Sequence, residues 1–273
     1  MAPDPESTRA TLKGFGQSGL TNGDLGEAAL LLASLDRPGV PLDQYRDHLD
    51  SIAKTAAKIS AEDPSSAMRQ TIAGKFAYEG DQKTYDDPQN ANLIRVIDRR
   101  KGLPVSLGIL YIVTARALGL EACGLNFPNH FLIRLQWDGG RAIVDPFNGG
   151  VTLDARALRD LLTHFQGASA ELSQEHYSDV SDFDILLRLQ NNIKLRLLRD
   201  GQLADALQVI RDMQLLAPGI PSLLREEGLL LARKGERRAA ISCLRDFLTW
   251  DNIREPERVD VTRVLQVLES QLN

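Results

Sequence analysis

The sequence contains few of the residues that bind metals or form disulfides. Only two cysteines and four histidines occur in 273 residues. Cys123 and Cys243 are far apart in the sequence, so they form neither a disulfide framework nor the paired spacing of a zinc site. The histidines form no metal-binding motif either. We therefore expect no structural metal and no cofactor.

The sequence also lacks a positive charge excess and a long hydrophobic run. Lysine and arginine total 32 against 37 acidic residues, a net charge of −5. The densest basic run, Arg99–Lys101, is too short to indicate a nucleic-acid surface, so we expect no nucleic-acid partner. The apolar run Ala28–Ala33 is far too short for a signal peptide or a membrane span. These features predict a cytoplasmic protein without a membrane partner.

The composition is otherwise that of a globular protein, with 43% hydrophobic and 25% charged residues. Residues 1–22 are rich in Gly, Ser, Thr and Pro, and we expect this segment to be disordered. Apolar residues then recur at helical spacing over residues 23–78, and Gly80–Leu93 has the composition of a loop. A further helix, starting at Pro104, is apolar nearly all round, which predicts that it is buried.

Strand patterns follow this helix. Glu121–Asn126 reads as a short strand, and the segments HFLIRLQW and AIVDPF, separated by the turn DGGR, predict a hairpin. From Asp154 onward the pattern is helical, and we expect no further strand. The chain is therefore predicted to be an α+β protein with an all-α C-terminal part.

The C-terminal part contains an internal repeat. The segment RDGQLADALQVIRDM (199–213) aligns with RKGERRAAISCLRDF (233–247) at a shift of 34 residues. That period is typical of tetratricopeptide helix pairs. We expect Gly201 and Gly235 in equivalent turns.

The repeat also predicts packing and a class of partner. Ala206 and Ala240 should be buried against the preceding helix, and a final helix should complete the stack, because about three repeats are needed to bury their faces. Residues 181–273 are therefore expected to form a tetratricopeptide tail that binds a protein or a peptide. The sequence indicates no oligomeric state.

The residues between the buried helix and the hairpin suggest chemistry. A thiol-protease-like site places its nucleophile at a helix N-terminus, a histidine on a neighbouring strand as base, and an acid that orients the histidine. Here His130 opens one predicted strand and Asp145 closes the next. We expect the two side chains to lie within hydrogen-bond reach or one water apart.

Three motifs carry a family resemblance: GLPVSLGILYIVTARALGL, GLNFPNHFLIRL and AIVDPFNGG. Together with YDDPQNANL and RRKGLP they resemble the transglutaminase-like superfamily, and more closely the bacterial SirB group, in which this domain precedes tetratricopeptide repeats. The resemblance covers roughly residues 24–265. It implies a papain-like core, made of a buried helix and a small antiparallel sheet with a helical N-terminal part, over residues 23–180.

The sequence departs from the family pattern at the nucleophile. The resemblance assigns His130 and Asp145 to the histidine and aspartate positions. The family cysteine lies about fifteen residues before the Leu-Gly that ends the buried helix, and that count leads from Gly119 to Pro104. A slip of two residues would place Ser106 there instead. Proline offers neither a nucleophile nor an amide hydrogen, and serine would depend wholly on the histidine as its base.

Three functions are compatible with this pattern. The first is a non-catalytic scaffold that binds a protein or peptide through its cleft and its tail. The second is an amide or ester hydrolase, or an acyltransferase, with a triad of Ser106, His130 and Asp145, which requires the serine oxygen to lie about 2.6–3.2 Å from the histidine nitrogen. The third is a purely structural or assembly role. The resemblance also implies three cleft-lining residues: Asn92, Pro104 and Asn129.

Overall fold

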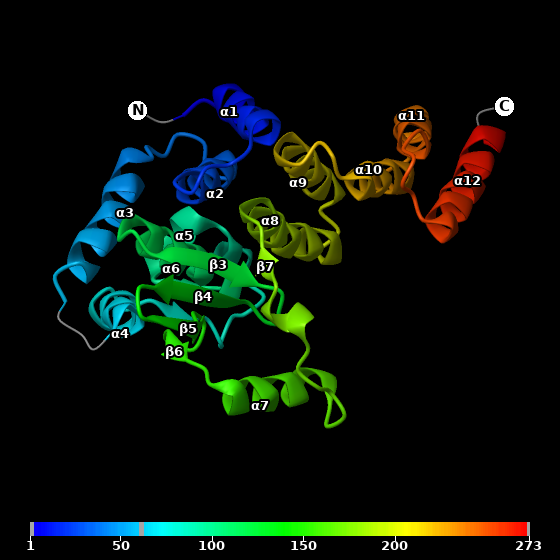
Figure 1. The fold of residues 1–273 in the computed structure, drawn as a ribbon. Coiled ribbons are helices and arrows are strands. Elements are labelled where there is room, and N and C mark those ends of the chain that lie inside the picture. The colour runs from blue at the N-terminus through cyan, green and yellow to red at the C-terminus, as the bar shows by residue number, and fades with distance from the viewer. Residues whose placement is uncertain (1–2, 60–62, 272–273) are drawn as a thin grey trace. The chain divides into compact units, whose positions relative to one another are not determined.

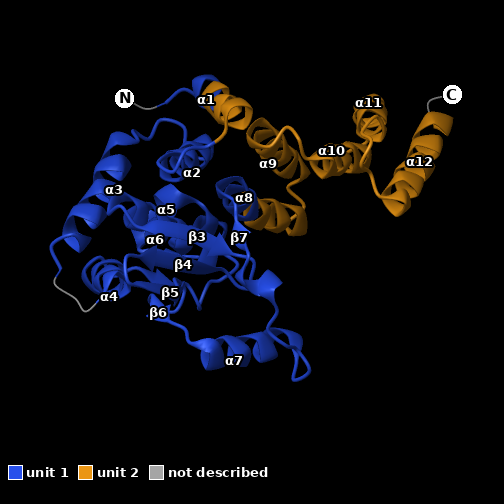
Figure 2. Ribbon diagram, viewed as in Figure 1, with its two compact units in different colours: residues 1–8, 20–189 blue, residues 9–19, 190–273 orange. Residues whose placement is uncertain are grey.

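The chain is described by a computed structural model that covers residues 3–59 and 63–271 (Figure 1). It divides into two compact units (Figure 2). One unit comprises residues 1–8 and 20–189, and the other comprises residues 9–19 and 190–273. The expected boundary near residue 181 therefore shifts into helix α8 (Asp182–Arg199), whose first half belongs to the first unit.

The N-terminal segment is helical, so the expectation of disorder over residues 1–22 is wrong for the part that the structure describes. Helix α1 extends over Pro5–Ser18. Asp4 accepts hydrogen bonds from two backbone amides of its first turn, at 3.1 and 3.0 Å. Leu12 is fully buried. A tertiary contact thus stabilises a segment whose composition predicts disorder. Residues 1–2 lie outside the described residues.

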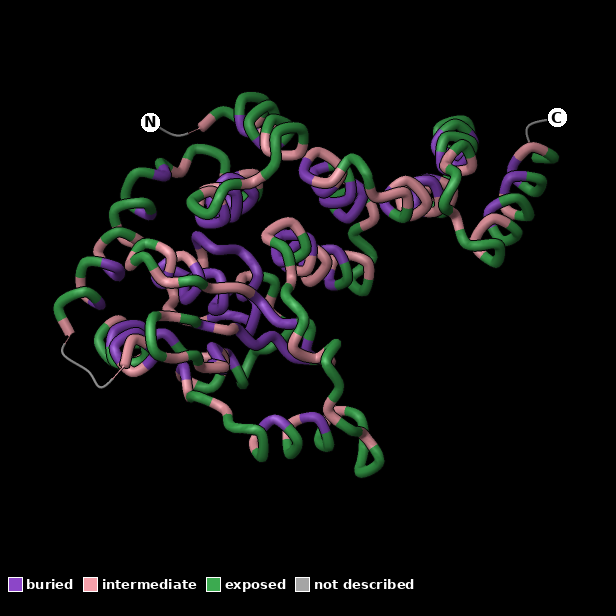
Figure 3. Tube along the Cα trace, in the orientation of Figure 1, coloured by how far each residue is buried: buried purple, intermediate pink, exposed green. Residues whose placement is uncertain are grey.

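Helices make up the first half of the first unit, as the apolar periodicity predicts. They are α2 (Asp24–Leu35), α3 (Asp43–Ala56), α4 (Pro64–Arg69), a π-helical turn (Gln70–Lys75), a 3-10 turn (Pro88–Ala91), α5 (Leu93–Arg99) and α6 (Pro104–Ala117). Helix α6 starts at Pro104, as expected, and is buried on nearly every side. Figure 3 shows the buried residues concentrated in the middle of this unit.

A five-stranded antiparallel sheet packs against α6. Its strand order is β6-β5-β4-β3-β7. The strands are β3 (Glu121–Leu125), β4 (Leu132–Trp137), β5 (Gly140–Asp145), β6 (Val151–Thr152) and β7 (Asp179–Val180). Strands β4 and β5 form the expected hairpin, with Ile133 opposite Val144. Helix α7 (Ala155–Gln166) covers the other face, where Leu158 and Leu162 pack with Leu125.

Besides the pairing of β6 with β5, two further strand pairings were not anticipated. The expectation of no strand after Asp154 is wrong, because β7 pairs with the end of β3. Strands β1 (Glu79–Gly80) and β2 (Lys101–Gly102) form a short parallel pair at the edge of the expected loop. All three strands are two residues long, which is too short to show a period-2 pattern in the sequence.

The second unit contains the C-terminal helices, which form consecutive pairs. They are the end of α8, α9 (Leu203–Leu216), α10 (Pro221–Arg233), α11 (Arg237–Leu248) and α12 (Glu255–Ser270).

The two repeats of this unit have the same local structure. Gly201 and Gly235 both have a positive φ, of 75° and 84°, and occupy equivalent turns. Such a φ favours glycine, because a side chain there meets the backbone. Ala206 and Ala240 are both fully buried. The predicted repeat geometry is confirmed at these four positions.

Among the described residues, no helix combines the length and the hydropathy needed to cross a bilayer.

Candidate functional site

His130 and Asp145 lie side by side at one end of the central sheet. His130 lies in a bend two residues before β4 rather than on the strand itself, and Asp145 is the last residue of β5. The His130 Nε2 atom is 3.0 Å from the Asp145 Oδ1 atom. Both residues are buried, with 6% and 2% of their surface exposed. The structure therefore brings these two candidate residues together.

The Asp145 carboxylate is bound mainly by the turn that follows it. Its Oδ1 atom accepts hydrogen bonds from the backbone amides of Phe147 and Asn148, at 3.0 and 3.2 Å, and Oδ2 accepts from the Asn148 side chain at 2.7 Å. Burial works to raise the pKa of Asp145, but the neighbouring His130 ring and the Asn148 hydrogen bonds outweigh it and hold that pKa below its usual value. The aspartate thus stays ionised and shapes the turn.

The His130 ring is held by aromatic contacts. Phe165 of α7 stacks on it at 5.9 Å between ring centroids, and Phe147 meets it edge-on at 6.3 Å. The His130 backbone oxygen accepts a hydrogen bond from Arg188 at 2.7 Å. Although Nε2 is close to Asp145, the approach lacks hydrogen-bond geometry, and Nε2 has no hydrogen-bond partner among the described residues.

Tyr111 is a member of this site that the sequence did not suggest. It comes from the middle of α6 and is buried, and its hydroxyl has no hydrogen-bond partner among the described residues. A Cβ on Gly150 would be 2.1 Å from this oxygen, so the hydroxyl lies against the turn after Asp145. Burial raises the pKa of Tyr111, and the Asp145 charge raises it further. Among the described residues, the Tyr111 hydroxyl is thus a buried polar group without a partner close enough to feel the Asp145 charge.

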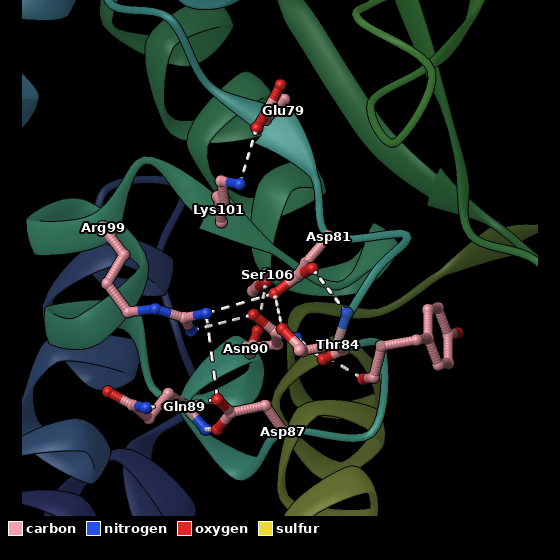
Figure 4. A network of polar contacts seen from close by, with 10 residues as sticks. Glu79, Asp81, Thr84, Asp87, Gln89, Asn90, Arg99, Lys101 and Ser106 are labelled. Carbon is pink, nitrogen blue, oxygen red and sulfur yellow. Dashed lines mark hydrogen bonds and ion pairs between the residues drawn. The ribbon is translucent and has the colours of Figure 1, made fainter.

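Ser106, the candidate nucleophile, is instead bonded to the backbone. Its hydroxyl is fully buried and lies 2.7 Å from the Asn90 carbonyl oxygen and 3.0 Å from that of Leu103, in donor geometry to both (Figure 4). No hydrogen bond joins Ser106 to His130 within the described ranges 3–59 and 63–271. The serine thus belongs to the contacts that fix the preceding loop, and the structure does not assemble the triad.

A polar network holds that loop on the start of α6 (Figure 4). Asp81 accepts hydrogen bonds from the Thr84 amide at 2.9 Å and from Arg99 at 3.1 Å. Burial works to raise the pKa of Asp81, but hydrogen bonds from Thr84, Asn90 and Arg99 outweigh it and hold that pKa well below its usual value. Arg99 also donates to the Asn90 side chain at 3.0 Å. The network links the loop to both α5 and α6.

The three residues expected to line a cleft lie at separate positions in the structure. Asn92 caps α5, accepting from the Arg95 amide at 3.1 Å and donating to the Ala33 carbonyl at 3.0 Å, so its polar groups are used within the fold. Pro104 is the buried first residue of α6. Asn129 is exposed and has a left-handed backbone, with φ of 55°, directly before His130. Of these three residues, Asn129 alone is exposed and adjacent to the His130–Asp145 pair.

Two surface hollows flank the turn after Asp145. One, of about 470 Å³, is lined by Ser66, Arg69, Gln70, Ala73, Gly74, Asn148 and Gly149. The other, of about 500 Å³, is lined by residues 79–83, Lys101 and residues 147–149. A third cavity, of about 950 Å³, is lined mainly by the outer sheet face and the start of α7, and neither His130 nor Asp145 lines it. The described residues contain no group of three or more metal-binding side chains.

Comparison with known proteins gives the same family as the motifs. The sequence profile of the transglutaminase-like superfamily matches residues 43–191, more than half of the chain. The UPF0162 protein of Xylella fastidiosa (strain Temecula1) is 30% identical over 228 residues, which cover 81% of this chain and 81% of that protein. The UPF0162 protein of Vibrio cholerae is 30% identical over 82% of this chain and 85% of its own length.

Protein SirB1 of Salmonella typhimurium is 24% identical over 252 residues, covering 89% of this chain and 93% of that protein. No solved structure gives a significant match. The matched region contains the buried helix, the hairpin and both members of the His130–Asp145 pair. The chain belongs to the transglutaminase-like superfamily, in the group that includes SirB1 and the UPF0162 proteins.

Proposed function

We propose that this protein is a non-catalytic, cytoplasmic member of its family that binds a protein or peptide through its transglutaminase-like cleft and a tetratricopeptide tail. One observation carries the proposal. The Ser106 hydroxyl, the only candidate nucleophile near the family's cysteine position, is fully buried and bonded to the Asn90 backbone carbonyl.

The chemistry of the helix start supports this proposal. A serine nucleophile needs a base that accepts its proton, whereas the Ser106 proton is directed at backbone carbonyls. Pro104 has no amide hydrogen to donate to an oxyanion, and one such donor contributes about 2.7–4 kcal/mol to catalysis. A protein that lacks both contributions is a poor acyl-transfer catalyst.

One buried polar group next to the His130–Asp145 pair suits the binding of a ligand. The Tyr111 hydroxyl is buried and has no hydrogen-bond partner among the described residues, and such an atom costs about 1–3 kcal/mol when unsatisfied. A small polar group of a ligand that reaches this hydroxyl would recover part of this cost. In this proposal His130 and Asp145 orient the site for binding and do not transfer protons.

The helical tail supports a role in protein binding. Its two helix pairs share the turn geometry at Gly201 and Gly235 and the buried alanines at Ala206 and Ala240. Stacked helix pairs with this period form extended surfaces that bind other proteins. The match to SirB1 covers 89% of this chain and so includes most of the tail as well as the core.

A turnover measurement tests the proposal. The purified protein and its His130→Ala variant are incubated with a panel of amide and activated-ester substrates. We expect equal rates for the two proteins on every substrate, no higher than those of a serum-albumin control. A rate at least tenfold higher for the wild type than for His130→Ala would show that the histidine acts as a catalytic base and would contradict the proposal.

A further inference from the structure

Helix α9 has two buried faces within the second unit. One face includes Ala206, Leu207 and Ile210, which belong to the apolar cluster shared with the later helices. The other buried residues of α9 outside that cluster are Val209, Asp212, Met213 and Leu216. Their spacing of three, one and three residues places them along one stripe of the helix. We call this set the α9 stripe. It is apolar except for one buried carboxylate.

Helix α1 lies on this stripe, and its residues 9–19 belong to the same unit (Figure 2). The Arg9 Nε atom is 2.8 Å from the Oδ1 atom of Asp212, whose exposed fraction is only 6%. Gly16 packs against the end of α9, where a Cβ would be 2.0 Å from the Leu215 carbonyl oxygen. Only a residue without a side chain allows this approach.

The α1 residues that make these contacts form one face. Arg9, Leu12 and Gly16 are three and four residues apart, and Leu12 is fully buried. The opposite face is open: Lys13 is exposed, and a Cβ on Gly14 would have nothing within 4 Å. Arg9 and Gly16 thus contact α9, Leu12 is buried on the same face of α1, and the other side of the helix is exposed to solvent.

Helix α1 is a weak helix by itself. It has 14 residues and two interior glycines, each of which costs about 1 kcal/mol relative to alanine. An isolated helix of this length is marginal in water even with a favourable sequence. Its helical state therefore depends on docking. A partner helix that makes the same contacts could take the place of α1.

We propose that the α9 stripe is a docking surface for a partner-protein helix that carries arginine, leucine and a small residue at the spacing of Arg9, Leu12 and Gly16, and that α1 fills this surface in cis. The arginine pairs with Asp212, and the small residue allows close approach to the end of α9. The inference rests on the proposed binding role of the tail and names the kind of partner. It does not depend on whether the cleft is catalytic.

The test releases α1 in the full chain and offers the same helix in trans. The releasing variant is Arg9→Glu/Gly16→Leu, which places a like charge at Asp212 and a side chain against Leu215. The matched control is Lys13→Glu/Gly14→Leu, with the same charge change and the same added leucine on the open face. A fluorescent peptide of residues 3–19 is the probe, and anisotropy measures its binding. Hydrogen exchange of the α1 amides reports release.

We expect the releasing variant to lose protection in α1 and to bind the peptide at least tenfold more tightly than the wild type and the control do. A peptide that itself carries Gly16→Leu should not bind. Loss of α1 protection without peptide binding would overturn the docking surface, and so would undiminished protection of α1. Dimerisation of the releasing variant, seen by light scattering, would assign the surface to a second copy and contradict a partner helix. The turnover comparison with His130→Ala is independent of all these outcomes.

Discussion

The Asp145 Oδ1 atom lies 3.0 Å from His130 Nε2 and also accepts two backbone hydrogen bonds from its own turn. The pair therefore has the spacing of a catalytic histidine and aspartate, but the aspartate also stabilises the turn that follows β5. This double use explains how the pair can persist in a fold without a nucleophile: the carboxylate closes the turn after β5 whether or not the histidine acts on a substrate.

Asp145→Ala should destabilise the protein more than His130→Ala does. The alanine leaves the amides of Phe147 and Asn148 without their acceptor, and hydrogen bonds to a charged group contribute about 1.5–3 kcal/mol each. We expect a loss of about 3 kcal/mol in the free energy of unfolding at pH 7, measured by urea denaturation. A smaller loss than that of His130→Ala would contradict the structural role of the aspartate.

Ser106→Ala should lower stability and leave the protein folded. The change removes a buried hydrogen bond to the Asn90 carbonyl, which keeps the Leu103 amide as a donor, so the cost is about 0.5–1.5 kcal/mol. Ser178→Ala is the matched control, because its hydroxyl makes a similar bond to the Glu175 carbonyl at the exposed surface. We expect the control to change the free energy of unfolding by less than about 0.5 kcal/mol. Equal effects of the two substitutions would contradict the account of Ser106.

His48 should make the protein less stable as the pH falls from 7.5 to 5. Burial, and then the charge of Arg100, lower the pKa of His48 from 6.5 to about 4. Between these values the unfolded chain binds a proton that the folded chain does not, so acid favours unfolding. Because the ring is only half buried, we expect a loss of about 1 kcal/mol over this range.

The variant His48→Gln isolates this effect, because glutamine does not titrate. Its free energy of unfolding should fall less than that of the wild type between pH 7.5 and pH 5, by about the same 1 kcal/mol. Parallel pH profiles for the two proteins would show that His48 takes up its proton equally in the folded and unfolded chains.

The two repeat turns should respond alike to alanine. Gly201→Ala and Gly235→Ala each place a side chain at a positive φ, which costs about 1–2 kcal/mol. Gly219→Ala is the control, since its φ is not in that region and a Cβ there meets nothing within 4 Å. Thermal unfolding should show a lower midpoint for the first two variants and no decrease for the third. An unchanged unfolding midpoint for either Gly201→Ala or Gly235→Ala would contradict the equivalence of the two repeat turns.

Features with a strong local pattern were predictable from the sequence. The buried α6 begins with Pro104 and has an apolar run of helical length, while the β4–β5 hairpin and the 34-residue repeat have periodicities that indicate their secondary structure. Helix α1 was not predictable, because it depends on Leu12 burial and on the ion pair between Arg9 and Asp212, distant in the sequence. Local composition carries no information on such a contact.

The site was predictable only in part for the same reason. His130 and Asp145 lie at the ends of neighbouring segments of one hairpin, so the sequence pattern brought them together. The Ser106 hydrogen bond depends on a loop residue, Asn90, whose position follows from the Asp81–Arg99 network. The sequence signal for Tyr111 was a hydroxyl-bearing residue among the aliphatic residues in the middle of α6.

The central claim is that Ser106 is not a nucleophile, and site-resolved labelling tests it most directly. The purified protein and its His130→Ala variant are treated with a serine-reactive fluorophosphonate probe, and modified residues are located by peptide mass spectrometry. We predict no labelling at Ser106 in either protein, because its hydroxyl is buried and bonded to the Asn90 carbonyl. Labelling of Ser106 that is present in the wild type and absent in His130→Ala would contradict this account.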